Sequence, residues 1–147
     1  MGWKALIPAT VLCMLASGCG TIPAPRVTDV YCSISGPCMV PVRVDNCVIS
    51  APSISVPAAV NVYWNIDERS AAYQFPEDSL KSPGVWVDDD DPANPQFVEA
   101  ARVTSYQFQL RDRHVSRKSY KYGVRVVRPD GTVCPIVKAN ISNGEFY

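Results

Sequence analysis

The chain has only one histidine, His114, among its 147 residues. A blue-copper site of the usual kind requires two histidines and a cysteine, so this count excludes one. A serine or cysteine hydrolase requires a base beside its nucleophile, and His114 is the only histidine that could act as that base. Because it lies in the polar segment 111–117 with no apolar pocket in view, we interpret it as an exposed turn histidine.

Long hydrophobic runs are also missing. The N-terminal apolar run covers only residues 5–16 and includes Pro8, whereas a membrane-spanning helix requires about 20 apolar residues. Lys4 precedes this run and small residues follow it, which is the order of a secretory signal. The composition, with 47% apolar and 19% charged residues, indicates a folded globular domain after the signal.

The signal ends in the sequence Ala16-Ser17-Gly18-Cys19, which resembles the lipobox of bacterial lipoproteins. The third residue before the cysteine is usually leucine in that class and is Ala16 here. The resemblance implies that Cys19 becomes the first mature residue and carries a diacylglycerol and an amide-linked acyl chain. Since each buried CH₂ group contributes about 0.8 kcal/mol, three chains would hold the protein at a membrane without spanning it.

The lipobox resemblance also sets the expected organisation and location. We expect a lipoprotein signal peptide over 1–18, a proline-containing tether over 19–30 and a single domain over 31–147. Gly20 stands where an aspartate is the usual inner-membrane retention signal, so the resemblance implies an outer-membrane anchor facing the periplasm. The alternative is an ordinary signal peptide cleaved near Ala16 or Gly18, which would leave Cys19 as a thiol or a disulfide partner.

Four cysteines remain for the domain, namely Cys32, Cys38, Cys47 and Cys134. In an exported domain this even number predicts two disulfides, for which three connectivities are open. We favour Cys32 with Cys38, because the Gly-Pro turn between them could bring them together, which leaves Cys47 for Cys134. A zinc site is the alternative, but the spacings lack the closely spaced ligand pairs of such sites. We expect no metal and no cofactor.

The net charge is zero, but the charges are unevenly distributed. Residues 67–99 contain nine acidic and two basic residues, whereas 102–128 contain eight basic and one acidic residue. The two segments could simply pair across the surface. If they do not, a basic tip could bind an envelope protein or an anionic glycan or lipid. The tip residues would be Arg111, Arg113, Arg117 and Lys118. An exported chain is not expected to bind nucleic acid.

Acidic residues provide two further candidates. Four consecutive aspartates at 88–91 raise the question of calcium, but they lack the spaced pattern of an EF-hand, so we interpret them as a solvated loop. Glu77, Asp78 and Glu99 are candidate acids for glycoside cleavage by position only.

The periodicity of the domain is two. In 60–66 the residues Val60, Val62, Trp64 and Ile66 share one face. We expect Thr104, Tyr106, Phe108 and Leu110 to point inward from one strand over 102–110. Tyr120, Tyr122, Val124 and Val126 are expected to do so over 119–128. Shorter strands are expected over 39–44, 53–56, 73–75, 84–87 and 132–137, with a turn at 129–131 and at most a short helix over 95–101.

Seven to eight short strands predict an all-β, antiparallel β-sandwich. The outline resembles immunoglobulin-like domains, in which a tyrosine corner bonds to nearby backbone, as Tyr120 or Tyr122 could; plain core packing is the alternative interpretation. It also resembles the cupredoxin sandwich, whose copper ligands are missing here.

The sequence therefore predicts a lipid-anchored periplasmic protein that acts as a non-catalytic binding, assembly or structural module. Small lipoprotein subunits of secretion machines have this outline, as do inhibitors of cell-wall-degrading enzymes. The alternatives are such an inhibitor or a small envelope hydrolase.

Overall fold

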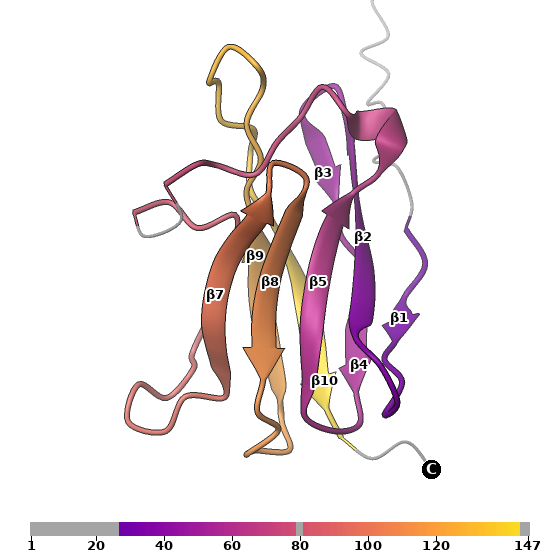
Figure 1. Ribbon diagram of the computed structural model, residues 1–147, viewed down its shortest axis with the longest axis vertical. Helices are drawn as coiled ribbons and strands as arrows, with labels where there is room; N and C mark the ends of the chain where they lie inside the picture. Colours follow the sequence, from indigo (N-terminus) through magenta and orange to yellow (C-terminus); the bar gives the residue numbers. More distant parts are fainter. Residues whose placement is uncertain (1–26, 79–80, 145–147) are drawn as a thin grey trace, which may run out of the picture.

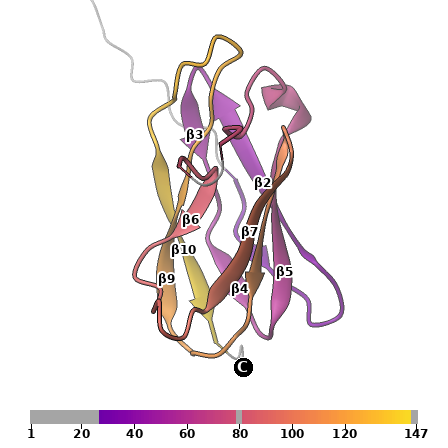
Figure 2. The same ribbon diagram turned by 60° about the vertical axis from the view of Figure 1, so that its left-hand side comes forward.

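Two five-stranded sheets pack face to face in the computed structural model, which describes residues 27–78 and 81–144 (Figures 1 and 2). The first sheet, in spatial order, contains β1 (Val30–Tyr31), β4 (Ile54–Val56), β10 (Val137–Asn143), β9 (Ser119–Val124) and β6 (Val85–Val87). The second contains β3 (Val48–Ser50), β2 (Cys38–Asp45), β5 (Val60–Ile66), β8 (Gln107–Asp112) and β7 (Phe97–Thr104). One 3₁₀ turn, η1 (Glu68–Ser70), follows β5. The predicted all-β sandwich is thus confirmed.

Both sheets are mixed, and the described residues form ten strands where seven or eight were expected. Strand β4 runs parallel to β1 and to β10, and β2 runs parallel to β5. The remaining pairs within the sheets are antiparallel. An all-antiparallel arrangement was wrong because alternation of apolar and polar residues shows which face is buried and carries no information on strand direction.

The clearest alternating segments form the centre of the sandwich. In β5 the side chains of Val62, Trp64 and Ile66 are buried, as the periodicity predicts. Tyr120, Tyr122 and Val124 are buried from β9, and Val126 is buried just beyond it. The rings of Trp64 and Tyr122 lie 5.5 Å apart between the two sheets. The hydrophobic core therefore follows from the period-two pattern of these two segments.

The strand expected over 102–110 is two strands. Strands β7 and β8 form a hairpin that turns at Ser105 and Tyr106. Phe108 and Leu110 point inward as expected, but Thr104 and Tyr106 are exposed, so that part of the prediction was wrong. The turn at Ser105 and Tyr106 interrupts the apolar–polar alternation, and it contains no Gly or Pro by which a turn is usually identified from sequence.

The short helix expected over 95–101 was also wrong, because β7 occupies Phe97–Thr104. This strand lies at the edge of its sheet, and most of its side chains are exposed. Its register with β8 shifts between Val98 and Ala101 and again between Arg102 and Thr104, and Glu99 has a φ of 57°. Such bulges disturb the alternation by which a strand is identified from sequence.

The expected strands over 73–75 and 132–137 are reduced to isolated bridges. Gln74 pairs with Val127, and Val127 pairs with Val133 across the predicted turn at 129–131. The last strand, β10, lies further along the chain at Val137–Asn143. The sequence did not predict β10, because its outward residues are polar. It did not predict β1 and β3, because they are short.

Both predicted disulfides are present. Cys32 and Cys38 are joined with their Cα atoms 5.0 Å apart, and Cys47 and Cys134 with theirs 5.1 Å apart. The first closes the loop between β1 and β2. The second attaches the turn after β2 to the segment that precedes β10, so it links the second sheet to the first.

The tyrosine corner is not formed. Tyr122 Oη donates a hydrogen bond to the carbonyl oxygen of Pro52, seventy residues earlier in the chain, rather than to nearby backbone. Tyr120 instead packs edge-on against Phe97, with ring centroids 5.1 Å apart. The interpretation of the two tyrosines as core packing is the correct one, and the likeness to immunoglobulin-like domains goes no further than the two-sheet sandwich.

Candidate binding surfaces

The predicted basic tip lies at one end of the sandwich, in and beside the loop that joins β8 to β9 (lower end in Figure 1). Arg111, Arg113, Arg117 and Lys118 are all exposed there. Arg113 Nη1 donates to the carbonyl oxygen of Pro95 at 3.0 Å, and the ammonium of Lys118 lies 4.6 Å from the centre of the Tyr120 ring. The tip therefore belongs to a loop whose basic side chains are partly held in place.

A buried carboxylate fixes the start of this loop. Asp112, the last residue of β8, is fully buried, and its Oδ1 accepts hydrogen bonds from Gln96 Nε2, from the backbone N–H of His114 at 2.7 Å and from Asn143 Nδ2 at 3.1 Å. The bond to His114 closes a turn in which that residue has a φ of 53°. Gln96 Oε1 accepts from the N–H of Ser116 at 2.8 Å. Two buried polar side chains thus determine the course of the basic loop.

Burial raises the pKa of Asp112 above its usual value, because the charged form loses its hydration. The three donors to Oδ1 act in the opposite direction but do not outweigh burial. Among the described residues, no donor reaches Asp112 Oδ2, and none reaches Asn143 Oδ1. The carboxyl group of Asp112 therefore takes up a proton at a higher pH than an exposed aspartate does.

His114 is not the exposed turn residue that we expected. Its side chain is half-buried, and Nε2 donates to the carbonyl oxygen of Val56 at 3.2 Å. The imidazole thereby joins the β8–β9 loop to the end of β4. We missed this role because the sequence around His114 is polar and carries no sign of the strand that it contacts.

The four aspartates at 88–91 lie in the loop between β6 and β7, at the same end as the basic tip (Figure 1). Asp88 accepts from Trp86 Nε1 at 3.1 Å and forms an ion pair with Lys138, whose hydrogen bond lowers the pKa of Asp88. Asp90 accepts from the N–H groups of Gln96 and Phe97. These oxygens thus shape a loop. Within residues 27–78 and 81–144 no three acidic, histidine or cysteine side chains are grouped to hold a metal ion.

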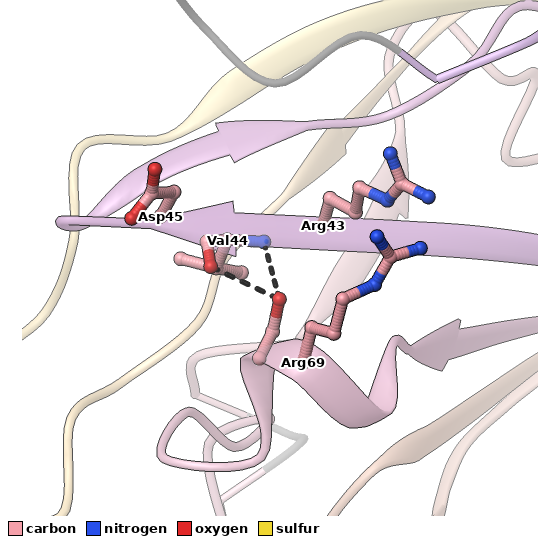
Figure 3. Close-up of a pocket in the computed structure, with 5 residues that line it drawn as sticks. Arg43, Val44, Asp45 and Arg69 are labelled. Carbon is pink, nitrogen blue, oxygen red and sulfur yellow. Dashed lines mark hydrogen bonds between the residues drawn. The ribbon is translucent and has the colours of Figure 1, made fainter. Parts of the chain in front are cut away.

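A pocket of about 320 Å³ between β2 and η1 was not expected (Figure 3). Arg43 Nε lies 3.2 Å and Arg69 Nε 3.5 Å from the carboxylate of Asp67. The N–H of Arg69 and the guanidinium of Arg43 both lower the pKa of Asp67. Ser70 Oγ is bonded to both the N–H and the carbonyl of Val44, as the dashed lines in Figure 3 show. Because Arg43 and Asp67 are far apart in sequence, nothing in the pattern pointed to this pair.

The remaining candidates are easily placed. The carboxylates of Glu77, Asp78 and Glu99 are exposed, so none has the apolar surroundings that favour a general acid. Cys19, the predicted lipid attachment point, lies outside the described residues, as does most of the tether. In the described part of the chain, no helix has the length and apolar character needed to cross a membrane.

Comparison with protein-family models found no family that matches this chain, and comparison with curated proteins found no relative of it.

Proposed function

We propose that this protein is an exported module, anchored to the outer membrane through a lipidated Cys19, that binds an anionic envelope partner with its basic tip and performs no chemistry of its own. The two disulfides support an oxidising, extracytoplasmic location. The signal-like N-terminus and its resemblance to a lipobox support the anchor.

The place where the described chain begins, at Val27, favours a basic tip that points away from the anchor. The described chain begins in the upper half of Figure 1, where Val27 and Thr28 lie beside Pro41 and Arg43 of β2. The β8–β9 loop lies at the lower end of the same view. A domain anchored through residue 19 would thus present Arg113 and Arg117 to the space beyond the membrane rather than to its own lipids.

The buried cluster beneath the tip is the observation that carries the proposal. Asp112 and Gln96 hold the backbone at His114 and Ser116, so the basic loop has a defined course before any partner binds. A loop that is already ordered loses less conformational entropy on binding. The exposed cations that this loop carries present a positive surface that is complementary to an anionic partner.

The anchor is tested by replacing Cys19 with serine and following the protein between membrane and soluble fractions of the envelope. We expect the wild-type protein in the membrane fraction, with a mass that includes three acyl chains, and the variant in the soluble fraction. A wild-type protein with a free or disulfide-bonded Cys19 would contradict the anchor.

The tip is tested by capture of envelope components through a C-terminal tag. We expect a stoichiometric partner with the wild-type protein and its loss in the double variant Arg113→Gln, Arg117→Gln. The matched control, Lys121→Gln with Arg128→Gln, removes two exposed charges elsewhere and should retain the partner. Equal loss in both variants would indicate a general charge effect and would contradict a specific tip.

A further inference from the structure

The outer face of the second sheet has two central rows of uncharged side chains. Figure 1 looks onto this face. Residues that are paired across neighbouring strands point to the same side of a sheet. One row, from β2 to β7, consists of Met39, Tyr63, Gln109 and Ala101. The next consists of Pro41, Asn65, Gln107 and Thr104. Eight adjoining positions on four strands therefore carry no charge.

Two of these side chains, those of Tyr63 and Gln109, have no side-chain partner within the described structure. The ring of Tyr63 is half-buried and meets neither a cation nor a second ring there. The amide of Gln109 forms no hydrogen bond among these residues. Gln107 Nε2 donates to Asn65 Oδ1 at 2.8 Å, which fixes the planes of these two amides. The face thus combines one half-buried aromatic ring without a cation or ring partner, one amide without a hydrogen bond and two oriented amides, all among the described residues.

A cation marks the lower end of the face. Asn61 of β5 pairs with Arg111 of β8 in the row below Tyr63. These two residues, with Ala59 and Val60, line a hollow of about 170 Å³. Arg111 is exposed. A ligand lying along the uncharged rows would therefore meet one positive charge at this end.

We propose that this face binds a glycan strand that bears amide and carboxylate substituents. A sugar ring has apolar C–H faces that can pack on the Tyr63 ring, and hydroxyl and amide groups that can both donate to and accept from the Gln109 amide. The Asn65 amide is already bonded to Gln107 and to the Tyr63 carbonyl. Arg111 suits a carboxylate, because its guanidinium offers two parallel donors. The uncharged rows complement a largely uncharged strand, and Arg111 at their lower edge complements its acid. Arg43, which follows Pro41 at the opposite edge, is paired with Asp67.

This inference rests on the proposed function in one respect, since export places the chain beside envelope glycans and Arg111 belongs to the basic tip. It does not depend on the anchor or on Arg113 and Arg117. A tip that binds a protein and a face that binds a glycan are therefore separable by experiment.

The test is calorimetric titration of the full-length protein in detergent with two probes. One is a tetramer of N-acetylglucosamine, which is uncharged, and the other is a tetrasaccharide of the same backbone carrying lactyl carboxylates. We expect the wild-type protein to bind both, the second more tightly. Tyr63→Ala should weaken both by about tenfold, whereas Arg111→Gln should weaken only the carboxylated probe.

Three controls keep the result interpretable. Tyr63→Phe retains the ring and should bind as the wild type does, and unfolding midpoints will show whether Tyr63→Ala is folded. Tyr31→Ala removes an exposed tyrosine from the other sheet and should change nothing. Arg113→Gln with Arg117→Gln should retain glycan binding; its loss of the captured partner alone would concern the tip and leave the glycan face intact.

Three results would overturn the inference. The first is no saturable binding of either probe by the folded wild-type protein. The second is binding that a folded Tyr63→Ala variant leaves unchanged. The third is a dimer in light scattering that Tyr63→Ala dissociates, because the face would then be covered by a second copy of the chain.

Discussion

The two outer faces of the sandwich treat their aromatic residues in opposite ways. On the first sheet, Trp86 lies across Gly123, with Arg125 4.8 Å and Lys138 5.1 Å from its ring centre, and its Nε1 donates to Asp88. On the second sheet, no described cation or ring covers Tyr63. One aromatic is therefore satisfied within the chain and contributes to the fold. The ring of Tyr63 is half-buried like that of Trp86, but no described cation or ring contacts it, so a ligand could supply that contact.

The largest effect should come from separating the sheets that carry these faces. Replacing both Cys47 and Cys134 with alanine removes a disulfide between residues 87 positions apart. The chain-entropy model predicts that the free energy of unfolding then falls by about 4 to 5 kcal/mol. Replacing Cys32 and Cys38, only six positions apart, should cost about 2 kcal/mol. Urea unfolding of both double variants measures the difference. Equal losses would contradict this view of the longer link.

The covered face is tested by Gly123→Ala. A Cβ atom there would come within 2.2 Å of Trp86 Cζ2, so the ring must leave its place between the two cations. We expect the free energy of unfolding to fall by about 1–3 kcal/mol. Gly36→Ala is the matched control, because no atom lies within 4 Å of a Cβ placed there. The explanation fails if the two variants are equally stable.

A smaller effect, dependent on pH, is expected at Asp112. Burial raises its pKa above the usual 3.8, so the folded state holds this proton more tightly than the unfolded chain does. The contribution of this proton to the free energy of unfolding is fully present below pH 3.8. It is lost as the pH rises through the raised pKa of Asp112 in the folded state. Relative to Asp112→Asn, which has no carboxyl group to ionise, the wild-type protein should therefore lose stability towards neutral pH.

The size of this loss is about 1.4 kcal/mol for each unit by which the pKa is raised. Urea unfolding of both proteins at several pH values between about 3 and 7 measures it. A difference in stability that stays constant over this range would mean that the carboxyl group of Asp112 titrates as it does in the unfolded chain.

The smallest effect is expected on the open face. Gln109→Ala removes an amide without a partner among the described residues, so the free energy of unfolding should change by less than about 0.5 kcal/mol. Thermal unfolding of Gln109→Ala and Gly123→Ala, measured together, compares the two changes in stability. A loss above about 1 kcal/mol would show that the amide contributes to the fold, and the two faces would then be less different than their contacts indicate.

The sequence predicted those elements whose burial follows a simple period. Strand β5 and the buried side of β9 were identified because their apolar residues alternate over at least three positions. The disulfide pairing was also favoured correctly, from an even cysteine count and one turn. Strand direction was not predictable. Residues 97–101 of β7 were expected to form at most a short helix, because an exposed edge strand with bulges has no clear period, whereas 102–104 were expected in a strand.

The buried cluster at the tip was missed, although one signal pointed to it. Asp112 is in phase with Phe108 and Leu110, so a strict continuation of the alternation places its carboxylate in the interior. The charge count alone shows it only as the single acid of a basic segment. Its partners, Gln96 and Asn143, come from distant parts of the chain, so only the folded structure shows them together.

The bulges of strand β7 also affect whether neighbouring copies of the molecule can pair edge to edge. A straight, regular edge would offer its free N–H and C=O groups to any neighbouring chain, and sheets could then grow from molecule to molecule. The register shifts around Glu99 and Arg102 make that edge irregular and place charged residues on it. Molecules packed densely on one surface would therefore meet at this edge without polymerising.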